Sequence, residues 1–175
     1  MAAKTGTYTL INSQVLGSNT GIITFSSIPQ TYTDLVLVVS AKVSSATYDI
    51  SALRVNSVTS GYSKTYLEAN GTSVTSGRAT AEISLRAGYL PGTNYTNQLS
   101  SDVYHFFDYA NSTTYKTVLC RCNAYNTSTN FNVQTQVSLI PTTSAITQIT
   151  LQTANGANLV TGSTFKLYGI EAGNL

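Results

Sequence analysis

The chain has 175 residues, which fits one ordinary domain able to bury a sizeable core without disulfides or metal ions. Charged residues make up only 9% of the chain, and its net charge is +2. The nine basic residues form no cluster, whereas nucleic-acid binding depends on a concentrated positive surface. Composition therefore sets nucleic acid aside as a primary partner, and we expect a single domain over residues 1–175.

Residue composition favours strands over helices. Ser and Thr together make up about 28% of the chain, while the strong helix formers Glu, Lys and Met are scarce. The longest apolar run, Leu35 to Val39, is far shorter than the ~20 residues that cross a bilayer. The N-terminal stretch MAAKTGTYTL lacks the apolar centre of a signal peptide, so we expect synthesis in a cytoplasm without secretion and no membrane partner.

Short apolar runs separated by Gly, Asn, Ser or Pro predict about eleven strands in chain order. They cover residues 8–16, 21–25, 34–43, 50–56, 63–67, 80–87, 102–109, 115–124, 131–139, 145–153 and 163–170. The dipeptides Asn70-Gly71, Pro91-Gly92 and Asn155-Gly156 predict chain reversals. Apolar residues recur nowhere at helical spacing over three turns, so helix content should be minimal.

Alternation of apolar and polar residues predicts which side of each strand is buried. In residues 80–87 the expected packed side carries Ala81, Ile83, Leu85 and Ala87. In residues 131–139 the expected packed side carries Phe131, Val133, Val137 and Leu139, against a wet side of Asn132, Gln134, Gln136 and Ser138. The unbroken run 34–40 predicts either a central strand or a strand at a subunit contact, and we favour the first.

Many strands of similar length with short polar turns predict an all-β fold with minimal helix, an antiparallel β-sandwich of jelly-roll type. A single-sheet barrel is the alternative. Neither architecture needs a cofactor.

The reactive side chains form no recognisable catalytic or metal-binding motif. His105 lies in an apolar strand, where a half-buried histidine is the ordinary outcome, and the seven acidic residues are expected at surfaces or turns. Cys120 and Cys122 point to one side of a strand and are expected to be buried small hydrophobes, since the sole histidine cannot complete a zinc site. We therefore expect no enzyme, no cofactor and no metal.

Tyrosines near predicted loops suggest contacts with other molecules. Tyr48, Tyr62 and Tyr95 are candidates for stacking on sugars, as exposed aromatic rings do in carbohydrate-binding sandwiches. The same rings suit protein interfaces, where they bury much area at little cost in rotamer entropy. An oligomer or lattice explains these residues more economically, although glycan binding stays open.

Two regions of the sequence carry a resemblance to a known family. They are Tyr8-Thr-Leu-Ile11 with Phe25-Ser-Ser-Ile-Pro-Gln-Thr-Tyr-Thr-Asp-Leu35, and Ala145-Ile-Thr-Gln-Ile-Thr-Leu151 with Gly162-Ser-Thr-Phe-Lys-Leu-Tyr-Gly-Ile170. With these motifs the chain resembles structural proteins of tailed-bacteriophage virions, the β-rich proteins of heads, tails and fibres. The family often carries a Trp in the strand before Ala145, which this chain lacks.

The resemblance implies a virion component. The first expectation is a capsid decoration (cement) protein that docks on the major capsid protein as a homotrimer and stabilises the head. The second is a tail, fibre or appendage component, and the third is a freestanding carbohydrate-binding module. The expected partners are virion proteins, and the expected location is the virion.

Overall fold

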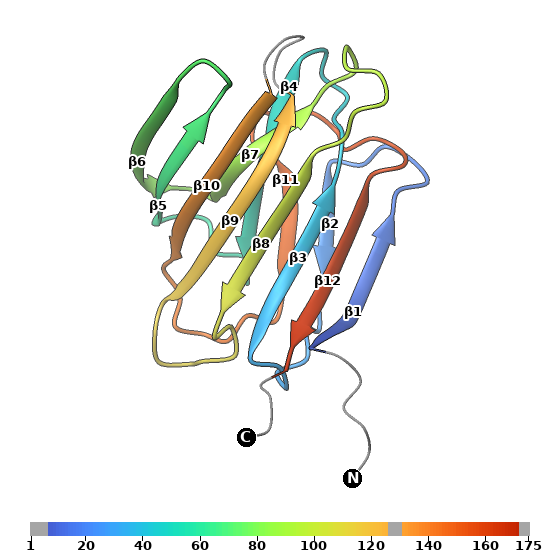
Figure 1. Ribbon diagram of the computed structural model, residues 1–175. Coiled ribbons are helices and arrows are strands. Elements are labelled where there is room, and N and C mark those ends of the chain that lie inside the picture. The colour runs from blue at the N-terminus through green and yellow to red at the C-terminus, as the bar shows by residue number, and fades with distance from the viewer. Residues whose placement is uncertain (1–6, 126–130, 172–175) are drawn as a thin grey trace.

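The computed structural model describes residues 7–125 and 131–171, which form twelve β-strands and no helix (Figure 1). The first six strands are β1 (Tyr8–Val15), β2 (Ile22–Phe25), β3 (Asp34–Ser40), β4 (Tyr48–Val55), β5 (Tyr62–Ala69) and β6 (Val74–Glu82). The last six are β7 (Leu85–Pro91), β8 (Ser101–Phe107), β9 (Lys116–Tyr125), β10 (Phe131–Ile140), β11 (Ile149–Thr153) and β12 (Thr164–Ile170).

The strands form two antiparallel sheets packed as a sandwich. The larger sheet has the order β1-β12-β3-β8-β9-β10-β5-β6, and the smaller has the order β2-β11-β4-β7. Four nested pairs, β1–β12, β2–β11, β3–β8 and β4–β7, alternate between the sheets as the chain winds inward. This winding is a jelly roll, so the predicted sandwich is confirmed and the single-sheet barrel is wrong.

Two inserted hairpins extend the larger sheet beyond the jelly roll. The hairpin β5–β6 lies between β4 and β7 in the sequence, and the hairpin β9–β10 lies between β8 and β11. Pairing of β9 with β8 and of β5 with β10 joins both hairpins to one side of the sheet. We call β9, β10, β5 and β6 the extension, which occupies the left half of Figure 1.

The hydrophobic core lies between the two sheets of the jelly roll. The larger sheet contributes Leu35, Leu37, Val39, Phe165 and Leu167, and the smaller contributes Ile23, Phe25, Leu53, Val55, Ile149 and Leu151. Each of these side chains is buried, which is consistent with the interdigitated packing of sandwich cores. The unbroken run of β3 is explained by its place inside the larger sheet, paired on both sides and buried at Leu35, Val36, Leu37 and Val39.

The predicted strand over residues 80–87 is wrong, because the chain bends there. Residues 80–82 end β6, residues 83 and 84 form a bend, and β7 begins at Leu85. Ala81 has a φ of 58°, which no regular strand accommodates, and Ile83 is exposed rather than packed. The turn at Asn70-Gly71 is confirmed: the Asn70 side-chain oxygen accepts hydrogen bonds from Thr72 and Ser73 backbone N–H groups, and Gly71 has a φ of 90°.

Gly88 is required both for its backbone and for its lack of a side chain. Its φ is 70°, and a Cβ there would lie 2.5 Å from Cys122 Cβ. Gly71 has a similar φ but open space around it. We expect Gly88→Ala to lower the free energy of unfolding by about 1–3 kcal/mol more than Gly71→Ala, because only Gly88→Ala adds overpacking to backbone strain. Urea unfolding measures both, and equal losses would contradict the packing argument.

Candidate functional site

Strand β10 turns its polar side inward and its apolar side to solvent. Its inner side chains Asn132, Gln134, Gln136 and Ser138 are only 1–7% exposed, whereas Phe131, Val133, Val137 and Leu139 are 38–51% exposed. The alternation predicted from the sequence is present, but the predicted packed side is wrong. The outer side is the unusual one, because sheet faces that meet water normally carry polar side chains.

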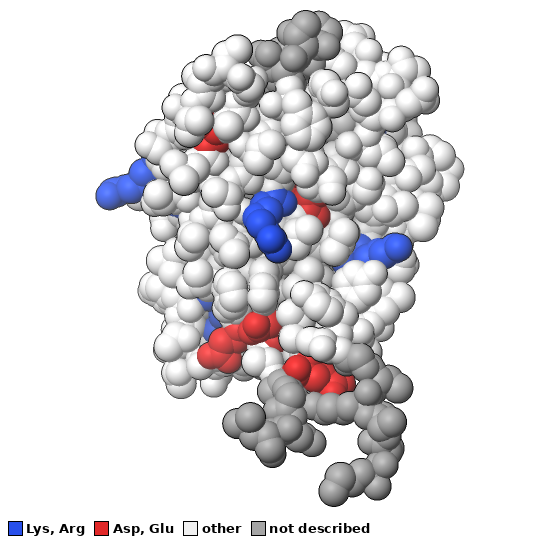
Figure 2. Space-filling view, in the orientation of Figure 1, with Lys and Arg blue, Asp and Glu red and all other residues white. Residues whose placement is uncertain are grey.

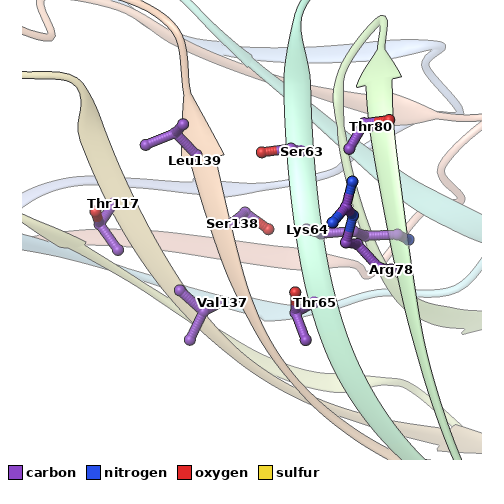
Figure 3. A pocket seen from close by; sticks show the side chains of 9 residues that line it. All are labelled: Ser63, Lys64, Thr65, Arg78, Thr80, Thr117, Val137, Ser138 and Leu139. Carbon is purple, nitrogen blue, oxygen red and sulfur yellow. The ribbon is translucent and has the colours of Figure 1, made fainter.

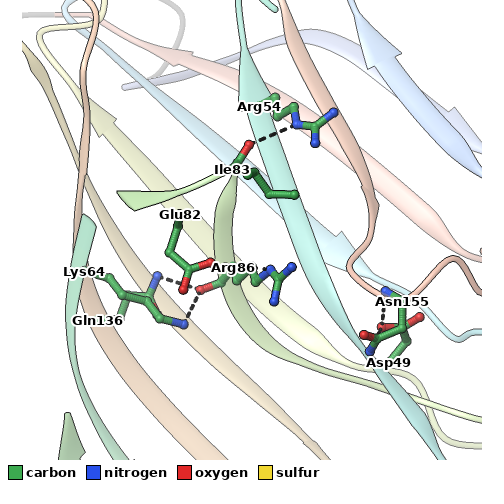
Figure 4. A network of polar contacts seen from close by, with 8 residues as sticks. All are labelled: Asp49, Arg54, Lys64, Glu82, Ile83, Arg86, Gln136 and Asn155. Atoms are coloured by element: carbon green, nitrogen blue, oxygen red, sulfur yellow. Dashed lines mark hydrogen bonds and ion pairs between the residues drawn. The ribbon is translucent and has the colours of Figure 1, made fainter. Parts of the chain in front are cut away.

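The edge of the smaller sheet explains this inversion. Strand β7 ends that sheet and leaves backbone groups unpaired in the interior, where each needs a partner. Gly88 N–H donates to Gln134 Oε1 at 2.9 Å. Arg86 C=O accepts from Gln136 Nε2 and from Lys64 Nζ, each at 3.0 Å, as Figure 4 shows. The polar side chains of β10 and β5 therefore satisfy the edge of β7, and the apolar side chains of β10 must face outward.

Further polar contacts fill the space beneath the extension. Asn132 Nδ2 donates to Glu68 Oε1 at 2.7 Å, and Gln136 Nε2 also donates to Ser138 Oγ at 2.7 Å. Burial and the neighbouring Glu68 carboxylate raise the pKa of Tyr89 to about 12. Side-chain hydrogen bonds therefore fill the inner side of the extension. The apolar side chains of the same strands face outward, where another molecule can contact them.

The outer side of the extension forms what we call the apolar face. It consists of Leu67, Leu119, Phe131, Val133, Val137 and Leu139, on strands that are hydrogen-bonded neighbours. Apart from the half-buried Leu119, they expose roughly 400 Å² of apolar surface, a size at which patches on monomeric proteins are often functional. Phe131 is further supported by an edge-on contact with Tyr125, with ring centroids 5.0 Å apart.

A shallow groove of about 360 Å³ runs along the apolar face between β10 and β6. Figure 3 shows Val137 and Leu139 on β10, Thr65 on β5, and Arg78 and Thr80 on β6 around it. Outward side chains of the described extension include two charged groups, Arg78 and Arg121, and no carboxylate. Figure 2 shows this side of the molecule as mostly uncharged, with a few separate basic and acidic groups.

The three tyrosines singled out from the sequence do not share a surface. Tyr62 is 1% exposed, and its hydroxyl bonds to Val55 N–H and Val58 C=O in the core. Tyr95 is 8% exposed, while Tyr48 is 38% exposed and meets the Tyr89 ring edge-on at 4.9 Å. Tyr62 begins a strand and packs inward, so its expected role in outside contacts is wrong, and the three rings form no common sugar platform.

The histidine and the two cysteines make their contacts within the fold. His105 Nε2 lies 2.9 Å from Asp34 Oδ2, its ring stacks on Phe107, and its cross-strand neighbours Val36 and Leu119 carry no reactive group. Cys120 and Cys122 are buried and unpaired on the inner side of β9, as predicted, and burial raises the pKa of both thiols.

Two acidic residues expected at the surface are buried instead. Asp49 is 1% exposed and accepts hydrogen bonds from the backbone N–H groups of Asn155 and Ala157, so it holds the turn after β11. Asp102 is fully buried beside Cys122, and burial raises its pKa to about 8. The surface expectation is wrong for both, because Asp49 shares the buried side of β4 with Ser51, and Asp102 shares the buried side of β8 with Tyr104.

Asp102 should make stability depend on pH. Burial raises the pKa of Asp102 to about 8 in the folded chain, against 3.8 for an unperturbed aspartate, so between these values the folded state holds a proton that the unfolded state releases. Its contribution to the free energy of unfolding should fall by up to about 1.4 kcal/mol per pH unit as pH rises from 4 to 8. Asp102→Asn removes this pH dependence, because an amide does not titrate.

Urea unfolding of both proteins at pH 5 and pH 7.5 isolates the contribution of Asp102, since all other groups are common to the two. The difference in stability between Asp102→Asn and the wild type should shift toward the variant at the higher pH. A difference independent of pH would show that Asp102 is ionised in the fold.

Within residues 7–125 and 131–171, no helix is long and apolar enough to cross a membrane. The same residues contain no group of three or more His, Cys, Asp or Glu side chains placed to bind a metal ion. Comparisons with known protein families, with curated proteins and with solved structures found no match.

Proposed function

We propose that this protein is a structural component of a tailed-bacteriophage particle, and specifically a capsid decoration protein that docks on the head lattice and stabilises it. The apolar face carries the proposal, because β10 holds four large apolar side chains in water. A bound protein that covers such a face removes its apolar side chains from water. The assignment of the protein to a virus rests on the sequence resemblance to virion proteins.

The chemistry of the apolar face suits a protein partner. It combines an apolar centre with Arg78 and Arg121 and has no carboxylate among the outward side chains of the described strands. A matching surface carries apolar side chains and acidic groups near its rim, which pair with guanidinium groups through charge-assisted hydrogen bonds. The major capsid protein is the proposed partner, and the proposed role needs no cofactor or catalytic step.

A tail or fibre location uses the same face and differs in the partner. Glycan binding has less support, since Tyr62 and Tyr95 are buried and Tyr48 stands apart from the apolar face. The site at which the protein attaches to the particle therefore distinguishes the head role from the tail or fibre role.

Val137→Asp tests the docking face. Val137 is 51% exposed at the centre of the face, so the substitution should change the free energy of unfolding by less than about 1 kcal/mol. It places a carboxylate in the apolar contact, so particles of the encoding virus that lack the protein should bind the variant at least tenfold more weakly than wild type. Val15→Asp is the control. Val15 is exposed on β1, at the opposite end of the larger sheet from the extension, so this variant should bind normally.

Electron microscopy of labelled protein added back to such particles shows where it binds. Label over the whole head, at a copy number approaching that of the coat protein, is the expected result. Label confined to the tail would favour the appendage role. Normal binding of Val137→Asp, or no binding of wild type, would contradict docking through this face.

A further inference from the structure

The free edge of β6 differs from the other sheet edges of this molecule. An edge strand offers unpaired backbone N–H and C=O groups, and proteins usually protect such edges. Strand β2 has only four residues, β1 is interrupted by an irregularity between Leu10 and Asn12, and β7 is satisfied by the side chains of Gln134 and Gln136. Each of these three edges has a protective feature.

Strand β6 has an irregularity only near its C-terminal end, where its register with β5 shifts between Ala79 and Glu82, and its charged side chains are Arg78 and Glu82. It is nine residues long, contains no Lys or Pro, and has no buried residue. Among the described strands it pairs with β5 alone. On its inner side the Tyr66 ring lies across Gly77, where a Cβ would come within 2.5 Å of the Tyr66 hydroxyl.

We propose that β6 pairs antiparallel with β6 of a second copy of this chain, so that two larger sheets join into one continuous sheet. This inference is independent of the proposed docking, because it uses the edge of the extension and not its apolar face. Ala81, with its φ of 58°, ends the regular part of the strand, which leaves residues 74–80 to pair. The midpoint of that segment is Gly77.

The register centred on Gly77 favours a second copy as the occupant. It places Ser76 opposite Arg78 of the second copy, Thr75 opposite Ala79, and Val74 opposite Thr80, each contact occurring twice by two-fold symmetry. The two Arg78 side chains are therefore not opposite one another, and the hydroxyl of Ser76 is placed to accept from a guanidinium group. Arg78 has no charged partner across the β5 ladder, where it faces Thr65.

The two-fold symmetry also determines which sides of the two copies face the same way. A two-fold axis perpendicular to the sheet leaves the outer sides of both copies facing the same way. Leu67 lies one strand from the new junction, so the two apolar faces flank it on one surface. A dimer of this kind presents two equal faces in one direction.

Charge substitutions at position 76 test this register. Ser76→Lys places an ammonium group opposite Arg78 of the second copy at two sites, and it should raise the dimer dissociation constant about tenfold. Ser76→Glu should lower it, and Ser76→Lys combined with Arg78→Glu should restore dimerisation by reversing the charge pair. Val15→Asp is the control, since Val15 lies on β1 at the opposite end of the larger sheet from β6, and it should leave dimerisation unchanged.

Sedimentation velocity over a range of concentrations measures the assembly state. The expected species has twice the 18.6 kDa mass of the chain and dissociates on dilution. Hydrogen exchange should show alternate backbone amides of residues 74–80 becoming protected as concentration rises, a change that a merely structural role of Ser76 would not cause. A monomer at all concentrations, a trimer, or a dimer unaffected by Ser76→Lys would overturn the proposal, and none of these results would decide whether the apolar face docks on a particle.

Discussion

The unpaired edge of β7 is the constraint on which the rest of the structure depends. A sandwich with sheets of unequal width must end the narrower sheet against the inner side of the wider one, and the backbone groups at that end cannot reach water. Here Gln134, Gln136 and Lys64 supply the missing partners from above. Because strand side chains alternate, satisfying that edge turns the apolar side chains of β10 to solvent, so the need for hydrogen bonds inside the molecule creates the surface available for binding outside it.

Local patterns in the sequence were enough to predict most strands and the fold class. Alternation and turn residues act over a few positions, which is why the sequence locates the reversal at Asn70-Gly71 and the start of the strand Asp34–Ser40, although the predicted strand continued to residue 43. The side of β10 that is buried could not be predicted the same way. That choice depends on Arg86 and Gly88, which are about fifty residues away in the sequence and contact β10 only in the folded sandwich.

The candidate site shows the same limit. Tyrosines near predicted loops suggest ligand contacts because aromatic rings often bind ligands. Tyr62, at the start of β5, instead lies in the core, where its hydroxyl forms hydrogen bonds with two backbone groups. Strand β6 was largely missed because Thr, Ser, Gly, Arg and Ala give it no apolar alternation. Its pairing with β5 depends on the ladder itself and on Tyr66 lying across Gly77, neither of which a strand pattern reports.

The pairing of Tyr8 with Ile170 has a consequence for how this fold can be reused. The first and last strands run side by side and in opposite directions, so the chain enters and leaves the jelly roll at one point, as Figure 1 shows. A domain with adjacent entry and exit can be spliced into a surface loop of an unrelated protein without stretching either chain. Insertion of this domain into another protein by gene fusion would therefore transfer the apolar face and the free edge of β6 together.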